Sequence, residues 1–271
     1  MKSTIQVMLV AAACSIAAPA LHAADGVLIV EQTTTGASTQ THQIQIAKDR
    51  MRAETTSAAG EKQAMVFDGT KQVMWIINYD KKTYSEMTKA DVDRLGGQMS
   101  DAMSKMQAQM QNMPPEQRAR IEAMMAGRGM GPAGAGAKTE YKKLGTDKVA
   151  KWTCDKYEGS RNGQKTLELC TVDPQALGLN AADFDVAHQL QAFFEKVMPA
   201  GADNMFRIGT GQADGFSGVP VRRVSLGSTP STSEITAVSR QSFPDATFAV
   251  PDGFQKEASP FAGRGRGRGG R

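Results

Sequence analysis

The spacing of hydrophobic residues changes twice along the chain. Between residues 26 and 87, apolar residues occur in short runs, and Ile44 and Ile46 alternate with Gln43 and Gln45. Such alternation is typical of a strand with one apolar face. Turn-forming pairs such as Asp68-Gly69 separate the runs, which indicates an antiparallel meander. The expected strands cover 27–30, 42–46, 51–56, 63–67, 71–78 and 83–87.

A helical period follows in residues 88–126. Thr88 and Asp91 resemble a capping box, which marks the start of a helix. Apolar residues then recur on one side of the predicted helix at Val92, Leu95, Met99, Met103, Met106, Met110 and Met113. Pro114-Pro115 ends this helix and begins a second one. The pattern predicts an inserted, Met-rich helical hairpin, followed by a Gly/Ala-rich linker over residues 127–138.

Strand patterns return after the linker, at 139–144, 151–158 and 164–172, and again at 219–227 and 232–242. Between these two groups lies a predicted helix over residues 180–198. Its buried side is expected to hold Phe184, Ala187, Leu190, Phe194 and Val197. The predicted fold class is α+β: a strongly curved antiparallel sheet, or half-barrel, with helices covering its concave face.

The first 23 residues have the pattern of a secretory signal peptide. Lys2 precedes a short apolar run, and small residues near Ala23 and Ala24 mark the expected cleavage site. The mature protein, a single domain over residues 24–258 with a tail over 259–271, is therefore expected in the periplasm. Acylation at Cys14 is a lesser alternative, because the residues around it only loosely match a lipoprotein box.

The positive charge of the chain is concentrated in its C-terminal tail. After loss of Lys2, 31 basic and 28 acidic residues remain, and four of the basic ones lie between Arg264 and Arg271. The body is thus nearly neutral, which argues against a nucleic-acid groove. The Gly/Arg tail is expected to be disordered, and its guanidinium groups could bind anionic lipid or lipopolysaccharide.

Two cysteines remain after the signal peptide. Cys154 and Cys170 flank a turn signal around Asn162-Gly163. A hairpin folded about Asn162 would place Cys154 opposite Cys170 and Lys156 opposite Glu168. We expect a structural disulfide, because a redox pair more often uses C-x-x-C spacing and a metal site would need further ligands.

Short motifs resemble one known family. They are Phe67-Asp68-Gly69, Trp75-Ile76-Ile77, Tyr84-Ser85-Glu86-Met87 and an ending from Phe248 to Phe254. Together with the signal peptide and the Met-rich helix, they are similar to the periplasmic proteins of domain of unknown function number 4412. These resemble the half-barrel of the outer-membrane lipoprotein carriers (Lol-type). The resemblance implies the fold and an apolar ligand, but no established activity.

The methionine stripe allows three interpretations. The side chains could pack on the sheet, or they could form an adaptable surface for lipid or unfolded polypeptide. A third hypothesis is a Cu(I) site, because soft thioethers select that ion, with Met103, Met106, Met110 and Met113 as ligands. The segment from Met113 to Glu122 also resembles the helix starts of Spy-type periplasmic stress chaperones.

Catalytic patterns are sparse, so the chain is not expected to be an enzyme or to hold a cofactor. The mature sequence contains only His42 and His188, and both fit structural or half-exposed positions. Gly209-Thr210-Gly211 lacks the lysine of a phosphate-binding loop.

We therefore expect a non-catalytic protein that binds an apolar ligand or an envelope protein. A Met-based copper or stress-response protein and a structural envelope component are the alternatives. The proposed ligand-binding residues are the apolar positions of the strands and helices, namely Ile44, Ile46, Met65, Phe67, Trp75, Met99, Met103, Met106, Met110, Phe184 and Phe194.

Overall fold

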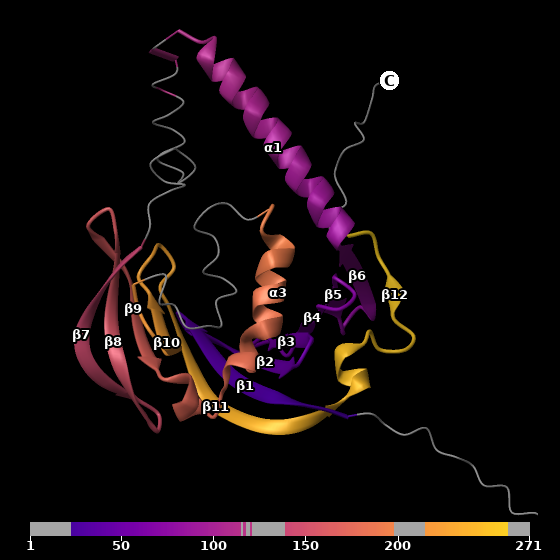
Figure 1. The fold of residues 1–271 in the computed structure, drawn as a ribbon, viewed down its shortest axis with the longest axis vertical. Coiled ribbons are helices and arrows are strands. Elements are labelled where there is room, and N and C mark those ends of the chain that lie inside the picture. Colours follow the sequence, from indigo (N-terminus) through magenta and orange to yellow (C-terminus); the bar gives the residue numbers. More distant parts are fainter. Residues whose placement is uncertain (1–22, 115, 118–119, 121–138, 198–214, 260–271) are drawn as a thin grey trace, which may run out of the picture.

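The structure is one open sheet that bends around a helix. The computed structural model describes residues 23–114, 116–117, 120, 139–197 and 215–259. Twelve strands are arranged in the order β12-β6-β5-β4-β3-β2-β1-β11-β10-β9-β8-β7. Figure 1 shows helix α3 inside the bend of the sheet, whereas helix α1 extends away from it. The expected signal peptide, the linker, the tail and most of the second insert helix lie outside the described residues.

The N-terminal half is the predicted meander. Its strands are β1 (Ala23–Thr35), β2 (Ser38–Ala47), β3 (Arg50–Thr56), β4 (Lys62–Asp68), β5 (Val73–Asn78) and β6 (Thr83–Thr88). Each strand pairs with the next in antiparallel fashion. The expected cleavage site, Ala23 and Ala24, lies at the first two residues of β1, where they pair with Pro244 and Phe243 of β11.

Helix α1 (Lys89–Gln111) begins directly at the end of β6. Thr88 is its N-cap and forms the predicted capping box with Asp91. The helix ends at Gln111, so Met113 lies beyond the last helical turn rather than on it. Only Val92 and Gly96 of α1 are buried.

The disulfide hairpin is formed by β8 (Trp152–Arg161) and β9 (Gln164–Val172), with β7 (Glu140–Val149) at the sheet edge. Asn162 and Gly163 have positive φ values of 53° and 74°, as a tight two-residue hairpin turn requires. The predicted Cys154–Cys170 disulfide is present, with a Cα–Cα distance of 5.4 Å.

The predicted register of this hairpin is wrong. Lys156, rather than Cys154, lies opposite Cys170, and Glu158 lies opposite Glu168. The two-residue turn and a bulge between Gly159 and Ser160 together shift the pairing, so the cysteines join diagonally.

Among the described residues after the hairpin, the chain forms η1 (Pro174–Leu177), η2 (Ala181–Phe184) and α3 (Asp185–Phe194). The predicted helix over 180–198 is therefore a 3₁₀ turn followed by a shorter α-helix. Phe193 is fully buried, whereas Phe194 and Val197 are only partly buried. The predicted buried side was thus displaced by one residue at its end.

The C-terminal strands complete the open sheet. They are β10 (Val219–Ser225), β11 (Ser231–Pro244) and β12 (Gln255–Lys256), with η5 (Asp245–Phe248) between the last two. Strand β11 pairs along the whole length of β1, which joins the two halves of the sheet. The short β12 pairs in parallel with β6, so the sheet is not purely antiparallel.

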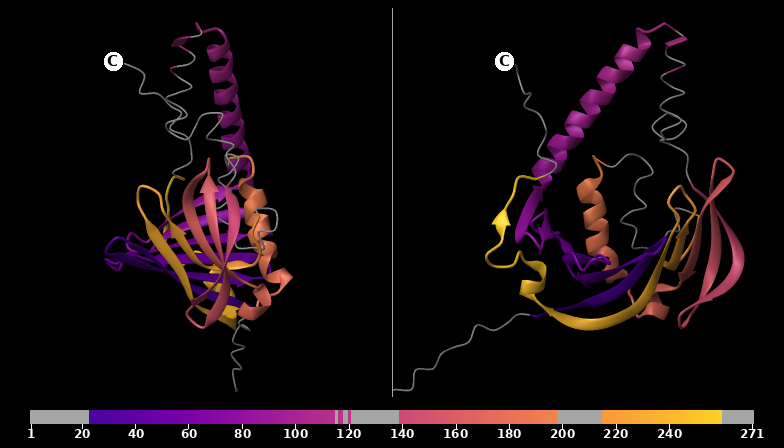
Figure 2. Two further views of the ribbon diagram at one scale, coloured as in Figure 1. Left: turned by 90° about the vertical axis from the view of Figure 1, so that its left-hand side faces the viewer. Right: turned by 180° about the vertical axis from the view of Figure 1, so that it is seen from behind.

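Both faces of the β1–β6 half are covered. One face packs with α3 in the largest apolar cluster, which includes Val27, Ile46 and Phe67. The other face forms a second cluster around Val66 and Ile77, against residues of β11, η5 and the segment before β12. The views in Figure 2 show α3 and the C-terminal segment on opposite sides of these strands. The apolar residues on the second face of these strands thus form a core of their own.

Candidate functional site

The apolar face beneath α3 collects six of the eleven predicted ligand-binding residues. Ile44, Ile46, Met65, Phe67, Phe184 and Phe194 all belong to its cluster. Phe67 meets Phe193 of α3 edge to face, with ring centroids 5.4 Å apart. Ile46 and Phe67 are 2 % and 1 % exposed, so they form the closed part of this face. Ile44, Met65 and Phe194 are only partly buried and lie at its margin.

A pocket opens at this margin. Its volume is about 430 Å³, and it is lined by Gln40, Ala53, Thr55, Ser57, Glu61, Gln63, Ala64, Met65 and Ile76. Ala53 pairs with Met65, and Met65 pairs with Ile76, so these three side chains share the face that carries α3. The volume lies within the range of about 300–1,000 Å³ that is common for small-ligand sites.

The pocket has an apolar floor and a polar rim. Ala53, Met65 and Ile76 supply the floor, whereas the polar lining residues supply amides, hydroxyls and one carboxylate. The adjacent His42 shares a hydrogen bond with Thr55, with Nδ1 and Oγ1 2.9 Å apart. His188 lies elsewhere and is exposed. The site can therefore hold an apolar group and hydrogen-bond a polar end.

Sequence reasoning identified only one of the nine residues that line the pocket, Met65. Ala53 is too small to stand out in a hydropathy pattern, and the polar rim resembles any solvated strand end. Ile76 was missed because every residue from Val73 to Ile77 is apolar, so alternation does not assign a face.

Trp75 is misplaced in the predicted site. Its neighbours in the strand, Met74 and Ile76, face α3, whereas Trp75 packs in the cluster on the opposite face. There its indole Nε1 donates a hydrogen bond of 3.1 Å to Glu86. Trp75 therefore does not line the pocket, which opens on the other face of the sheet.

The methionine stripe also departs from its predicted place. Met99, Met103 and Met106 are 40 %, 64 % and 40 % exposed, so they do not cover the sheet. Met110 is partly buried, and Met113 lies past the helix end. The interpretation that the stripe packs on the sheet is wrong for its exposed members. Met103 and Met106 remain one turn apart on α1, as the copper hypothesis requires.

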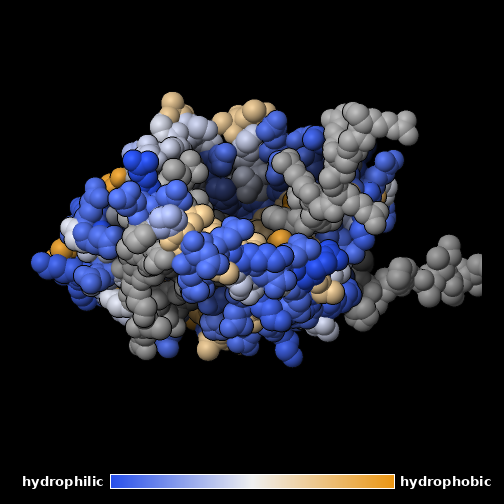
Figure 3. Space-filling view, turned by 90° about the horizontal axis from the view of Figure 1, so that it is seen from above, coloured by the Kyte–Doolittle hydropathy of each residue, from blue (hydrophilic) through white to orange (hydrophobic). Residues whose placement is uncertain are grey.

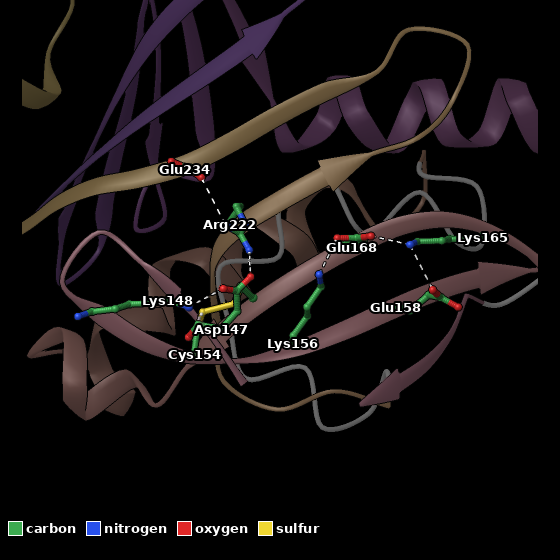
Figure 4. Close-up of polar contacts among 10 residues, drawn as sticks. Asp147, Lys148, Cys154, Lys156, Glu158, Lys165, Glu168, Arg222 and Glu234 are labelled. Atoms are coloured by element: carbon green, nitrogen blue, oxygen red, sulfur yellow. Dashed lines mark hydrogen bonds and ion pairs between the residues drawn. A yellow bond between two sulfur atoms is a disulfide. The ribbon is translucent and has the colours of Figure 1, made fainter. Parts of the chain in front are cut away.

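Charged residues form a row across strands β7 to β11. Figure 4 shows Lys156, Glu168, Lys165 and Glu158 as a chain of ion pairs near the disulfide. Their N–O distances are 3.4 Å, 2.5 Å and 3.3 Å in that order. Arg222 pairs with Asp147 and lies 4.0 Å from Glu234.

These contacts shift the pKa values of three members, Lys165, Glu168 and Asp147, towards the charged form. The Lys165 ammonium donates hydrogen bonds to the carboxylates of Glu168 and Glu158, which raise the pKa of Lys165. The backbone N–H of Lys148, followed by Arg222, lowers the pKa of the Asp147 carboxyl. Such shifts move the groups away from proton exchange at neutral pH, so the row is best described as a structural network.

Two further observations concern metals and membranes. Within the described ranges, no group of three or more His, Cys, Asp or Glu side chains is placed to hold a metal ion. None of the helices in that same part of the chain is long and apolar enough to cross a membrane.

Figure 3, which looks down on the molecule, shows a mostly hydrophilic surface with small separate apolar patches among its coloured residues.

Comparison with known proteins gives resemblance in structure only. No protein-family model and no curated protein sequence matches the chain, so the resemblance to domain of unknown function number 4412 is not confirmed. Several solved structures are similar to it, and three of them are described here. The first is an uncharacterized conserved protein from Thermus thermophilus, with a TM-score of 0.44 and 10 % identity over 86 % of this chain and 90 % of that one.

The second is MucB in complex with MucA(peri), with a TM-score of 0.35 and 12 % identity over 84 % of this chain and 55 % of that one. The third is a LolA superfamily protein from Nitrosomonas europaea, with a TM-score of 0.28 and 10 % identity over 83 % of this chain and 90 % of that one.

Proposed function

We propose that the protein is a non-catalytic periplasmic binding protein for an apolar ligand, such as a lipid, a lipoprotein acyl chain or an exposed apolar polypeptide segment. The observation that carries this proposal is the pocket of about 430 Å³ on strands β2 to β5. Its floor continues the apolar face, through Met65 and Ile76, up to the packed core. Each methylene that enters such a site contributes roughly 0.8 kcal/mol to binding.

The composition of the rim defines the other end of the ligand. Gln40, Thr55, Ser57 and Gln63 offer uncharged hydrogen-bonding groups, and Glu61 adds a negative charge. An amphiphile with a neutral or cationic polar end therefore fits better than one with an anionic end. A burial site for an apolar chain with hydrogen bonds at one end needs no catalytic group.

The test is binding of an environment-sensitive fatty-alcohol probe to the mature protein. Ala53→Leu fills the floor of the pocket and should weaken binding at least about tenfold. Ala237→Leu is the matched control, because Ala237 is an exposed strand residue outside the pocket. It should leave binding unchanged, and so should Trp75→Phe, which alters the opposite face.

The outcome also separates the pocket from the methionine stripe. Replacing Met103, Met106 and Met110 together by Leu should leave probe binding in place if the pocket is the site. Absence of probe uptake by folded wild-type protein, or equal binding by the two Leu variants at Ala53 and Ala237, would refute the proposal. Circular dichroism and melting curves establish that each variant is folded.

A further inference from the structure

Helix α1 carries an exposed apolar surface. Residues 97–109 of the helix are all exposed, and Met99, Met103 and Met106 lie among them. Figures 1 and 2 show this part of α1 extending beyond the sheet. Methionine is enriched in protein interfaces, where its flexible thioether adapts to a partner.

The surroundings of these methionines resemble an interface more than an ordinary solvated helix. At about 100° per residue, Met99, Met103 and Met106 fall within a sector of about 60°. The positions that flank the sector are uncharged: Gln98, Ser100, Gln107 and Gln109. The charged residues Asp101 and Lys105 lie more than about 100° from its centre. Charge is thus depleted at the centre, as in the core of an interface.

The apolar residues of this segment are spaced symmetrically about a point between Ala102 and Met103. Ala102 and Met103 lie directly on either side of this point, and Met99 and Met106 lie at equal distances from it. Two copies of α1 in antiparallel orientation would therefore meet apolar residue to apolar residue. The uncharged flanks would face each other without repulsion, which is the self-complementarity that a two-fold interface needs.

We propose that the exposed part of α1 is a self-association surface, where two copies of the protein pair their helices antiparallel about a two-fold axis near Met103. The paired segment, residues 97–109, is about 20 Å long. The contact is therefore smaller than a standard interface of about 1,200–2,000 Å². A weak, concentration-dependent dimer is the expected result.

Cysteine cross-linking tests both the association and its orientation. In the mature chain Cys154 and Cys170 form a disulfide, so an introduced thiol has no competing free cysteine. Under mild oxidation, a mixture of Met99→Cys and Met106→Cys proteins should cross-link at least about tenfold faster than either variant alone. Met103→Cys should cross-link with itself. Ala108→Cys, on the far side of α1, is the matched control and should remain monomeric.

Other patterns would overturn the proposal. Rapid cross-linking of Met99→Cys with itself would indicate parallel helices. Cross-linking of every variant at the rate of the Ala108→Cys control would show that the stripe does not meet a second copy.

A charge at the two-fold axis provides an independent measurement. Met103→Lys places two like charges side by side in the dimer and should abolish self-association in sedimentation velocity at high concentration. Ala108→Lys should sediment as the wild type does. Since both positions are exposed, the melting temperatures of the two variants should agree, which separates lost association from misfolding. A wild-type protein that stays monomeric at all concentrations would refute the proposal.

Discussion

Helices α1 and α3 show that an amphipathic pattern does not by itself decide whether a helix is buried. Helix α3 buries Val186, Leu190 and Phe193 completely and lies within the bend of the sheet. Helix α1 is more than twice as long, yet only Val92 and Gly96 are buried. The apolar side of α3 consists of branched and aromatic residues, whereas that of α1 is mainly methionine.

The starting point of each helix explains the difference. Helix α1 starts where β6 ends, and its direction is fixed by the capping box and by contact with the end of α3. Asp93 forms ion pairs with Lys89 at 2.7 Å and with Lys196 at 3.0 Å. Beyond this base the helix leaves the sheet. Helix α3 follows η1 and η2, lies inside the bend of the sheet and packs on its apolar face.

The largest effect is expected from truncating a buried side chain of α3. Phe193→Ala removes a fully buried ring that packs against Phe67 and should lower the free energy of unfolding by about 3–5 kcal/mol. Met103→Ala on α1 is the control and should change it by less than about 0.5 kcal/mol. Urea denaturation measures both values. Equal losses of unfolding free energy in the two variants would show that α1 is packed in solution, which would contradict the difference in burial between the two helices.

Adjacent glycines in α1 provide a sharper comparison. A Cβ at Gly96 would lie 2.8 Å from Cβ of Lys196 and 3.0 Å from its carbonyl oxygen, whereas nothing lies within 4 Å of one at Gly97. Gly96→Ala should therefore destabilise the protein, by about 1 kcal/mol. Gly97→Ala should stabilise it by about 0.5–1 kcal/mol, because alanine favours the helix. Thermal unfolding distinguishes the two signs, and stabilisation by both variants would contradict the α1–α3 contact.

A third comparison concerns the cap of α1. Thr88→Ala removes the hydroxyl that bonds Asp91 and should cost about 1 kcal/mol. The hydroxyl and backbone N–H of Thr88 lower the pKa of the Asp91 carboxyl. A lowered pKa means that the folded state binds the proton less well than the unfolded chain.

The cap should therefore stabilise the protein fully above the ordinary carboxyl pKa and lose this contribution as the pH falls through the lowered value. Wild-type protein should lose more stability on acidification than Thr88→Ala does. Unfolding curves between neutral and acidic pH measure this difference. Parallel pH profiles for the two proteins would show that the capping box does not form in solution.

Local sequence determined most of the elements. Alternation and turn residues predicted the strands to within a few residues at most boundaries, because each strand of the meander pairs with its neighbour across a short turn. The capping residues Thr88 and Asp91 predicted the start of α1 for a similar reason, since cap and helix are contiguous. The disulfide followed from two cysteines on adjacent strands, even though a bulge altered the register.

Tertiary structure alone decided the arrangement of the site. The pairing of β1 with β11 joins residues about 200 positions apart, and no local pattern encodes such a pairing. It brings the C-terminal segment against one face of β3–β6, which gives Trp75 a core of its own and leaves α3 to cover the other face. Residues Val73 to Ile77 are all apolar, so their sequence does not assign them to a face. The packing of α3 on one face and of the C-terminal segment on the other decides which of their side chains reach the pocket. The exposed methionines of α1 depend likewise on the direction in which the helix leaves the sheet, which packing at its base sets and hydrophobic spacing does not.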